Sequence, residues 1–336
     1  MGFSSQAGQL IAKTQTTPGT YDPTTGTAGV GIKLKSGSFA PNRELMILDA
    51  EIGGGRDVVD AMLGGVSYSG DFDFYARPQA VALLLKACLG TVVSTVASGV
   101  NTHTITPSDA AQLPFLSVEH VIGNGLEAYQ YTDVVVTSLH LEAEANGFLQ
   151  GTVSMIARIQ TAGITKTAAP VWDNTEVAVG TNILCYYNGV TLPAKSFSLD
   201  IANNFDDDDF RLGSFFIGDL TPKRREVTGG FSIRPNDSSL WRQAVNGQAS
   251  AVSPGGLVTK APFRIDAKTY ATIAGSTPLT PFEYDISMPN FALRPYALEA
   301  SGDDVIENDI EGQALRPSNA TPVMTVLVKN DKAAVA

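Results

Sequence analysis

Three histidines, His103, His120 and His140, have the widest capacity for catalysis or metal binding in this chain. No serine, cysteine or aspartate near any of them completes a recognisable nucleophile signature. Glu119 adjoins His120 and Glu142 follows His140 by two positions, but no pair of cysteines accompanies either histidine to complete a zinc site. We therefore expect structural roles for all three histidines. The sequence predicts neither an enzyme nor a bound cofactor or metal.

Two glycine patterns and one acidic run are the other candidates for ligand binding. Residues 29–31 and 123–125 each read Gly-x-Gly, but neither lies at a strand-to-helix junction with the third glycine of a dinucleotide site. The acidic run consists of Asp206, Asp207, Asp208 and Asp209, whose oxygens could hold a cation such as calcium. It lacks the interspersed glycine and the final glutamate of a calcium loop, so we expect a solvated acidic loop.

Lys223, Arg224 and Arg225 form the only dense basic cluster of the sequence. The chain as a whole is acidic, with 23 basic against 34 acidic side chains and a formal net charge of −11. A nucleic-acid clamp needs the opposite balance, because cationic side chains must neutralise the phosphates. We hypothesise instead that the basic cluster pairs with carboxylates of an adjoining subunit, among them the acidic run.

The composition of the 336 residues favours many strands joined by turns. Hydrophobic residues make up 43% of the chain, which also contains 32 glycines and 18 prolines. Charged residues make up only 17%, which leaves weakly polar surface for contacts between subunits.

Cys88 and Cys185 are too few and too far apart for a disulfide framework, so we expect buried free thiols and assembly in a reducing cytoplasm. We see no signal peptide and no apolar run of about 20 residues, and expect a soluble protein.

Alternation of apolar residues predicts the strands of the first half. Residues 66–74 alternate strictly, and Arg77-Pro78 then forms a corner that opens a helix ending at Gly90. Asn146-Gly147 favours a two-residue hairpin turn. Further strands are predicted over residues 29–35, 45–48, 116–122, 134–143 and 151–159. One slip in the alternation of residues 134–143 indicates a bulge.

The second half repeats this order of elements. Residues 227–233 form the corresponding strand, Arg234-Pro235 the corner, and residues 240–247 the helix. Further strands are predicted over residues 197–201, 263–268, 282–288, 296–300, 309–314 and 324–329. The offset of about 160 residues has the size of one domain and indicates a duplication. We predict an arm over residues 1–26, domains over 27–162 and 183–330, a linker over 163–182 and a tail over 331–336.

This shared order of motifs resembles the tail tube family of long-tailed, siphophage-type bacteriophages, in the group with a duplicated tube domain. The resemblance covers residues 30–330 and rests on residues 70–78, 89–90, 103–105, 113–119, 133–139, 212–214 and 227–231. It implies a mainly β chain with two tandem β-sandwich or β-barrel domains. Each domain would have a flanking short helix and a long loop or hairpin arm that reaches a neighbour.

The resemblance also implies an assembly. Six tube domains would close a ring around a β-barrel, so three chains would complete a pseudo-sixfold ring, and rings would stack into the tube of the virion tail. The acidic run and the basic cluster would then meet across subunits or stacked rings. DNA would pass through an acidic lumen during ejection without specific binding. Partners would be other copies and the tape measure, tail terminator and distal tail proteins, with no membrane.

Two other function classes are alternatives to a tail tube protein. An adhesion or carbohydrate-binding module of a phage tail, built of two β-sandwiches, would need aromatic platforms, and Trp172 and Trp241 are the only tryptophans. A hydrolase would need the catalytic constellation that the histidines do not form.

Overall fold

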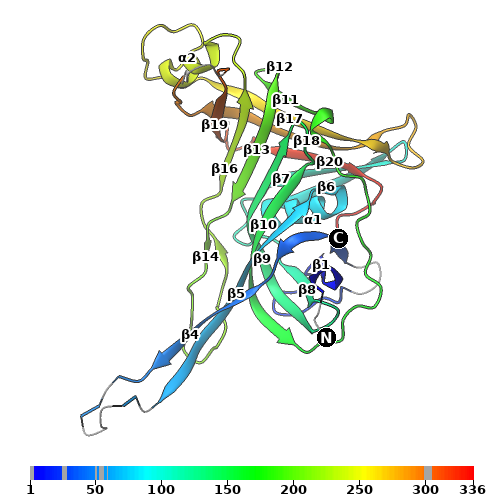
Figure 1. The fold of residues 1–336 in the computed structure, drawn as a ribbon, viewed down its shortest axis with the longest axis vertical. Helices are drawn as coiled ribbons and strands as arrows, with labels where there is room; N and C mark the ends of the chain where they lie inside the picture. Colours follow the sequence, from blue (N-terminus) through cyan, green and yellow to red (C-terminus); the bar gives the residue numbers. More distant parts are fainter. Residues whose placement is uncertain (1–3, 25–28, 50, 53–56, 59, 299–304) are drawn as a thin grey trace.

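The computed structural model describes residues 4–24, 29–49, 51–52, 57–58, 60–298 and 305–336 (Figure 1). Within these residues the chain is mainly β, as the sequence predicts, with one continuous sheet of eighteen strands and a separate pair. The α-helices described are α1 (Pro78–Leu89) and α2 (Ser239–Asn246), and the 3-10 helices are η1 (Ser5–Ala7) and η3 (Gly180–Asn182). Neither α-helix in this part of the chain has the length and apolar character needed to cross a membrane.

Strands lie at most of the predicted segments, and the predicted bulge of β9 is present opposite Ser154 and Met155. Strands over residues 9–14, 90–97, 100–107 and 190–192 were not predicted. The first half contains β1 (Gln9–Thr14), β2 (Val30–Ile32), β3 (Leu34–Gly37), β4 (Ala40–Ile47), β5 (Ala61–Tyr75), β6 (Gly90–Ala97), β7 (Val100–Pro107), β8 (Leu116–Ile122), β9 (Glu127–Glu144) and β10 (Gln150–Ala162). The second half contains β11 (Ile183–Tyr187), β12 (Val190–Leu192), β13 (Ala194–Ala202), β14 (Phe205–Asp206), β15 (Thr221–Pro222), β16 (Glu226–Ile233), β17 (Lys260–Thr272), β18 (Pro281–Leu293), β19 (Asn308–Ala314) and β20 (Thr325–Asn330).

The same strand order occurs in both halves of the chain. It is β3–β5–β10–β9 in the first half and β13–β16–β19–β18 in the second. The registers of these strands also correspond. Leu34 pairs with Phe74 in the first half, Ala194 pairs with Ile233 in the second, and a bulge follows each pair. Equivalent residues of these strands are 160 positions apart in β3 and β13 and 159 apart in β5 and β16.

The two halves are joined edge to edge. β9 pairs with β13, from Ser138 opposite Ala202 to Glu144 opposite Ser196. This pairing makes one eight-stranded sheet, β3–β5–β10–β9–β13–β16–β19–β18, which we call the junction sheet. Elsewhere β20, from the end of the chain, lies between β18 and β7 and joins the halves a second time.

One hydrophobic core spans both halves. Alternate side chains of the junction sheet point into it, which is the period-two pattern of a sheet with one covered face. They include Phe72, Phe74, Leu139, Leu141, Val153, Leu199, Ile201, Phe231 and Ile310. Helix α1 is apolar on nearly all sides and is buried accordingly, and Gly90, with a φ of +105°, ends it.

The predicted N-terminal arm contains a buried strand. Leu10, Ile11 and Ala12 of β1 are fully buried, and β1 pairs with β2 and β8. The polar composition of residues 1–26 had concealed this short apolar run, which fills a place in the sheet. Part of the predicted arm, residues 1–3 and 25–26, lies outside the described residues.

The predicted linker of residues 163–182 is a strap that lies against the first half. Asp173 is fully buried and its carboxylate accepts hydrogen bonds from the backbone N–H groups of Gln79 (2.9 Å) and Ala80 (3.0 Å) at the start of α1. Leu149 donates its N–H to the Ala178 carbonyl at 2.8 Å. A segment that caps a helix and pairs with a neighbour cannot move as a free linker.

Two local predictions were wrong. The connection from β9 to β10 spans residues 145–149 and is not a two-residue turn, because the strap also pairs with it at Phe148. Residues 296–298 form no strand, and the Tyr296 carbonyl instead accepts from the Trp241 side chain at 3.0 Å; residues 299–300 of that prediction lie outside the described part.

Candidate assembly surface

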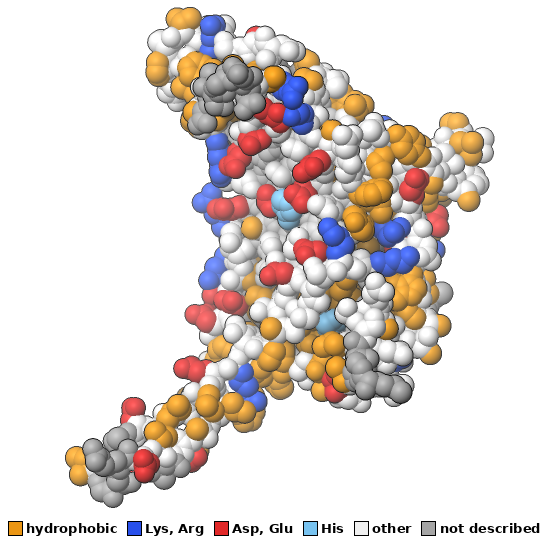
Figure 2. Space-filling view, viewed as in Figure 1, with side chains coloured by type: hydrophobic (Ala, Val, Ile, Leu, Met, Phe, Trp, Pro, Cys, Tyr) orange, Lys and Arg blue, Asp and Glu red, His pale blue; other side chains and the backbone are white. Residues whose placement is uncertain are grey.

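The face of the junction sheet that points away from the core is polar and acidic. Hydroxyl side chains such as Thr152 and Ser198 alternate there with carboxylates. The carboxylates of this face are Asp71, Asp73, Glu142, Glu144, Asp200, Asp309 and Glu311. Figure 2 shows this side of the molecule, where acidic side chains gather around a histidine. Part of the negative charge of the chain is therefore concentrated on one face of the junction sheet.

Hydrogen bonds and an ion pair connect some of these carboxylates to neighbouring side chains. Asp73 accepts from the Ser36 hydroxyl at 2.5 Å and from the Thr152 hydroxyl at 2.6 Å, and these bonds lower the pKa of Asp73. Glu311 pairs with Arg294 at 3.1 Å. The face is therefore negatively charged at neutral pH, with neighbouring strands linked through their side chains.

His140 lies on this face where the two halves meet. Its Nδ1 is 2.6 Å from an Asp200 oxygen of β13, and its Nε2 is 3.4 Å from a Glu142 oxygen of β9. The hydrogen bond to Asp200 raises the pKa of His140, against the opposing effect of partial burial. We call these three residues the junction cluster. The cluster is a polar contact across the β9–β13 pairing. This contact is consistent with the structural role expected for His140.

The loop of residues 203–225, between β13 and β16, folds back onto the first half. Val66 donates its N–H to the Phe215 carbonyl at 2.8 Å. Ile217 and Leu220 form a small buried cluster with Phe115 and Val135 of the first half. The loop is therefore a second contact between the halves, in addition to the paired strands.

The acidic run and the basic cluster both lie in this loop, and part of each is paired within the chain. Lys223 is 2.5 Å from Asp206, and Asp209 contacts Arg211 at 2.6 Å. Arg225 is half-buried, and donates to the Asn203 side chain at 3.1 Å and to the Ser108 carbonyl at 3.0 Å. Arg224 is exposed and lies 3.5 Å from a Glu226 oxygen, and the remaining members, Asp207 and Asp208, are exposed.

The hairpin of β4 and β5 projects from the body of the molecule, and we call it the arm (Figure 1). Its outer pairs are apolar, with Leu45 opposite Leu63 and Met46 opposite Met62. These four side chains are 50–64% exposed. Figure 2 shows the apolar surface continuing along the arm. A two-stranded apolar ribbon is marginally stable alone in water, so this surface is suited to contact with another molecule.

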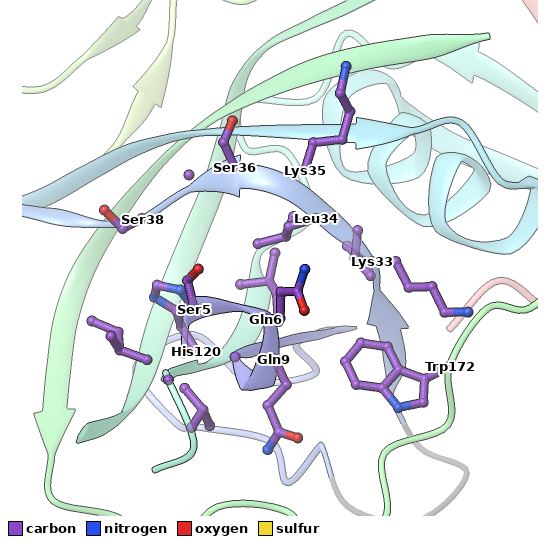
Figure 3. Close-up of a pocket in the computed structure, with 17 residues that line it drawn as sticks. Ser5, Gln6, Gln9, Lys33, Leu34, Lys35, Ser36, Ser38, His120 and Trp172 are labelled. Atoms are coloured by element: carbon purple, nitrogen blue, oxygen red, sulfur yellow. The ribbon is translucent and has the colours of Figure 1, made fainter. Parts of the chain in front are cut away.

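A groove runs beside β3, between η1, β1 and the end of β8 (Figure 3). Leu34 and Trp172 contribute apolar surface to it, and Lys33 and Lys35 lie on its rim. His120 also lines the groove; its ring is packed between Phe39 and Phe72, and burial lowers the pKa of His120 to about 4. His120 is therefore neutral at physiological pH.

The other chemistry-bearing residues are buried in structural positions. His103 lies between the Ser94 hydroxyl (2.8 Å) and the Asn330 side chain (2.9 Å). Cys88 and Cys185 are the predicted buried free thiols, and burial raises the pKa of each to about 12. In the described part of the chain no three His, Cys, Asp or Glu side chains are grouped to hold a metal ion.

Sequence reasoning missed the surfaces that depend on pairing. The apolar run of residues 45–48 predicts a strand but not its exposure on the arm. The alternation of His140 and Glu142 placed them on one face, but nothing in the sequence brought Asp200 beside them. The groove is formed by segments from both ends of the first half, so no local pattern indicated it.

A twice-repeated antiparallel sheet with an acidic face and a projecting apolar arm is suited to assembly with other copies of the same chain. The phage tail tube protein family matches residues 5–314, and this chain belongs to that family. The sequence resemblance is thereby confirmed, and the chain is a structural component of the virion tail. Comparison with curated proteins gives no match.

Proposed function

We propose that three copies of this chain close a ring and that rings stack into the tail tube through which DNA leaves the virion. The observation that supports this best is the β9–β13 pairing, by which one chain joins two units of the same strand order. We take these units as duplicated tube domains, over residues 27–162 and 183–330. Repeating the join continues the sheet, and a closed ring leaves no edge strand exposed. Three chains supply six units.

The acidic face of the junction sheet would line the lumen. Like charges repel phosphate, so DNA would pass such a wall without binding to it. The hydroxyl side chains between the carboxylates keep the surface hydrated. The low pKa of Asp73 keeps its charge in place at any pH above the ordinary range of a carboxyl group.

The arm and the loop of residues 203–225 occupy equivalent places in the two halves, since each leads to the strand before an α-helix. The loop is docked on the first half of its own chain, whereas the arm extends into solvent. We propose that the arm contacts an adjacent ring and buries its apolar side chains there. Asp207 and Asp208 would make polar contacts between rings, together with Asp206, Asp209, Lys223, Arg224 and Arg225, which already bond within the chain.

The remaining partners follow from a tube of this kind. One end would meet the tail terminator protein and the other the distal tail protein, with the tape measure protein inside during assembly in the host cytoplasm. A long flexible tail without a contractile sheath suits the duplicated chain.

Electron microscopy of the purified protein tests the proposal. We expect rings or tubes with a central pore and six repeats around the axis. Mass measurement of single rings should give three chains of 35.4 kDa. Compact monomers at every concentration, or a ring with another number of chains, would contradict the proposal, and monomers that bind glycans would favour the adhesion module.

A further inference from the structure

The groove beside β3 has a counterpart in the second half of the chain. It has a volume of about 720 Å³ and is bounded by η1, β1 and β3. The corresponding elements of the second half are η3, β11 and β13, because β1 pairs with β2 as β11 pairs with β12. Leu10 corresponds to Cys185, and Ser36 to Ser196. The cavity beside β13 has a volume of only about 20 Å³.

The counterpart is filled by the other half of the same chain. The end of β9 lies along β13, and Ala145 donates its N–H to the Lys195 carbonyl at 2.7 Å. At the start of β10, Leu149 bonds to Ala178, just before η3. The two places thus differ in what lies against them: a neighbouring half fills the place beside β13, whereas no segment of the described chain fills the groove beside β3.

The segment equivalent to this filler is the β18–β19 end. Leu293 pairs with Gly312 as Val136 pairs with Met155, an offset of 157 residues. Arg294 and Pro295 are both exposed before Tyr296, which packs against the core, so the bulge of β9 recurs here and the offset holds beyond it. Ala297 then corresponds to His140, and Val305 and Ile306 correspond to Phe148 and Leu149. In its own chain this end contacts no groove, and Leu298, Val305 and Ile306 are 43%, 63% and 44% exposed.

We propose that the groove receives the β18–β19 end of a second copy of this chain, with Ala297 of that copy opposite Ala40. This inference rests on the proposed ring and names its contact. Ala40 is the first-half equivalent of Asp200, because Ala40 pairs with Ser69 on β5 and Asp200 pairs with Thr228 on β16. Asp200 is the residue opposite His140 within the chain, so Ala40 is the expected residue opposite Ala297. The apolar side chains at residues 305–306 would cover η1.

Charge supports the same occupant. Lys33 and Lys35 on the rim bond to the neutral side chains of Asn174 (2.6 Å) and Gln150 (2.7 Å), and neither forms an ion pair with a described residue. The connection from β18 to β19 of the arriving copy is acidic in sequence, with Glu299, Asp303 and Asp304. These three residues lie outside the described part of the chain.

The proposal makes the two kinds of join in a ring chemically different. The join within a chain contains the junction cluster, where His140 contacts Asp200. The join between chains has Ala297 and Ala40 at that place. A ring of three chains therefore alternates polar joins with joins between small side chains.

Disulfide trapping tests the register. Residues directly opposite on antiparallel strands have Cα atoms about 4.5–5.5 Å apart, within the range that a disulfide spans. We would prepare the double variant Ala40→Cys/Ala297→Cys, each single variant, and the matched control Ala40→Cys/Ala292→Cys. Ala292 lies five residues away, about 16 Å along an extended strand. The native Cys88 and Cys185 are buried and should not react.

Assembled protein would be oxidised and run on non-reducing gels. We expect covalent trimers from the first double variant, at least tenfold more than from the control, and none from either single variant. Rings that form normally but cross-link no better than the control would overturn the groove contact and leave the proposed function standing. Absence of rings from the unmodified chain would overturn both.

A second measurement does not depend on cysteine chemistry. Ile306→Asp places a charge in the apolar contact but lies at the surface of the isolated chain, so its circular dichroism spectrum should be unchanged. We expect it to lower the yield of rings at least tenfold, whereas Leu279→Asp, at an exposed site just before β18 and thus at the opposite end of that strand from Leu293, should not. Normal assembly of Ile306→Asp would also overturn the proposal.

Discussion

Asp173 connects the strap to helix α1 through hydrogen bonds, and its replacement by alanine should destabilise the folded chain strongly. Its carboxylate is fully buried and accepts from the N–H groups of Gln79 and Ala80 at 2.9 and 3.0 Å. No helical carbonyl can serve these two donors, because the first N–H groups of a helix have no partner within it. The same carboxylate accepts from the Thr175 hydroxyl at 2.5 Å.

The magnitude follows from these contacts. Each buried donor left without an acceptor costs about 1–3 kcal/mol, and the favourable interaction of the negative charge with the helix N-terminus adds up to about 2 kcal/mol. Partial rescue by water reduces the sum, so we expect Asp173→Ala to lower the free energy of unfolding by about 3–5 kcal/mol. Asp173→Asn keeps one oxygen acceptor and should lose about 1–2 kcal/mol.

Urea unfolding of the unassembled chain, followed by circular dichroism, measures both variants. Asp22→Ala is the matched control, because Asp22 also accepts from a backbone N–H, that of Thr16, but at the surface. The control should change stability by less than about 1 kcal/mol. A loss below about 1 kcal/mol for Asp173→Ala, or equal losses for all three variants, would refute the reasoning.

Three further predictions concern the contacts between halves and between copies. Asn203→Ala removes the donor to the Cys88 and Val136 carbonyls, at 2.9 and 3.1 Å, and should cost about 2–4 kcal/mol by urea unfolding, against little change for Asn42→Ala at an exposed position of β4. Leu45→Ser/Leu63→Ser should leave rings intact in micrographs but shorten or abolish tubes; full-length tubes would contradict a role of the arm in stacking. The raised pKa of His140 means that the junction cluster stabilises the folded chain fully below pH about 6.5 and loses this effect as pH rises through the folded value. Since the cluster is partly exposed, His140→Gln should cost less than about 1 kcal/mol at pH 6 and still less at pH 9, and an equal or larger loss at pH 9 would show the sign to be wrong.

Much of the local structure could be predicted from the sequence because its causes are local. Strict alternation in residues 66–74 fixed a strand with one buried face, and Pro78 and Gly90 suit the two ends of α1 for steric reasons. The slip in residues 134–143 marked the bulge of β9. The repeated order of strand, corner and helix gave the duplication and, through it, the family.

The surfaces that matter for assembly could not be predicted in the same way. Asp173 caps a helix more than ninety residues earlier, and His140 meets Asp200 sixty residues later, so no spacing in the sequence connects them. The polar composition of residues 1–26 and 163–182 suggested an arm and a linker, but both supply backbone hydrogen bonds that the first half lacks without them.

The sequence by itself therefore determined the fold class, the repeat and the acidic balance, since each depends on residue type and period along the chain. Only the tertiary structure decided which strand edges meet within the chain and which stay open. It also decided that the place beside β13 is filled while the groove beside β3 is empty. The physical reason is that any strand can offer its backbone to a neighbour. Which neighbour it takes depends on how distant segments pack around a common core.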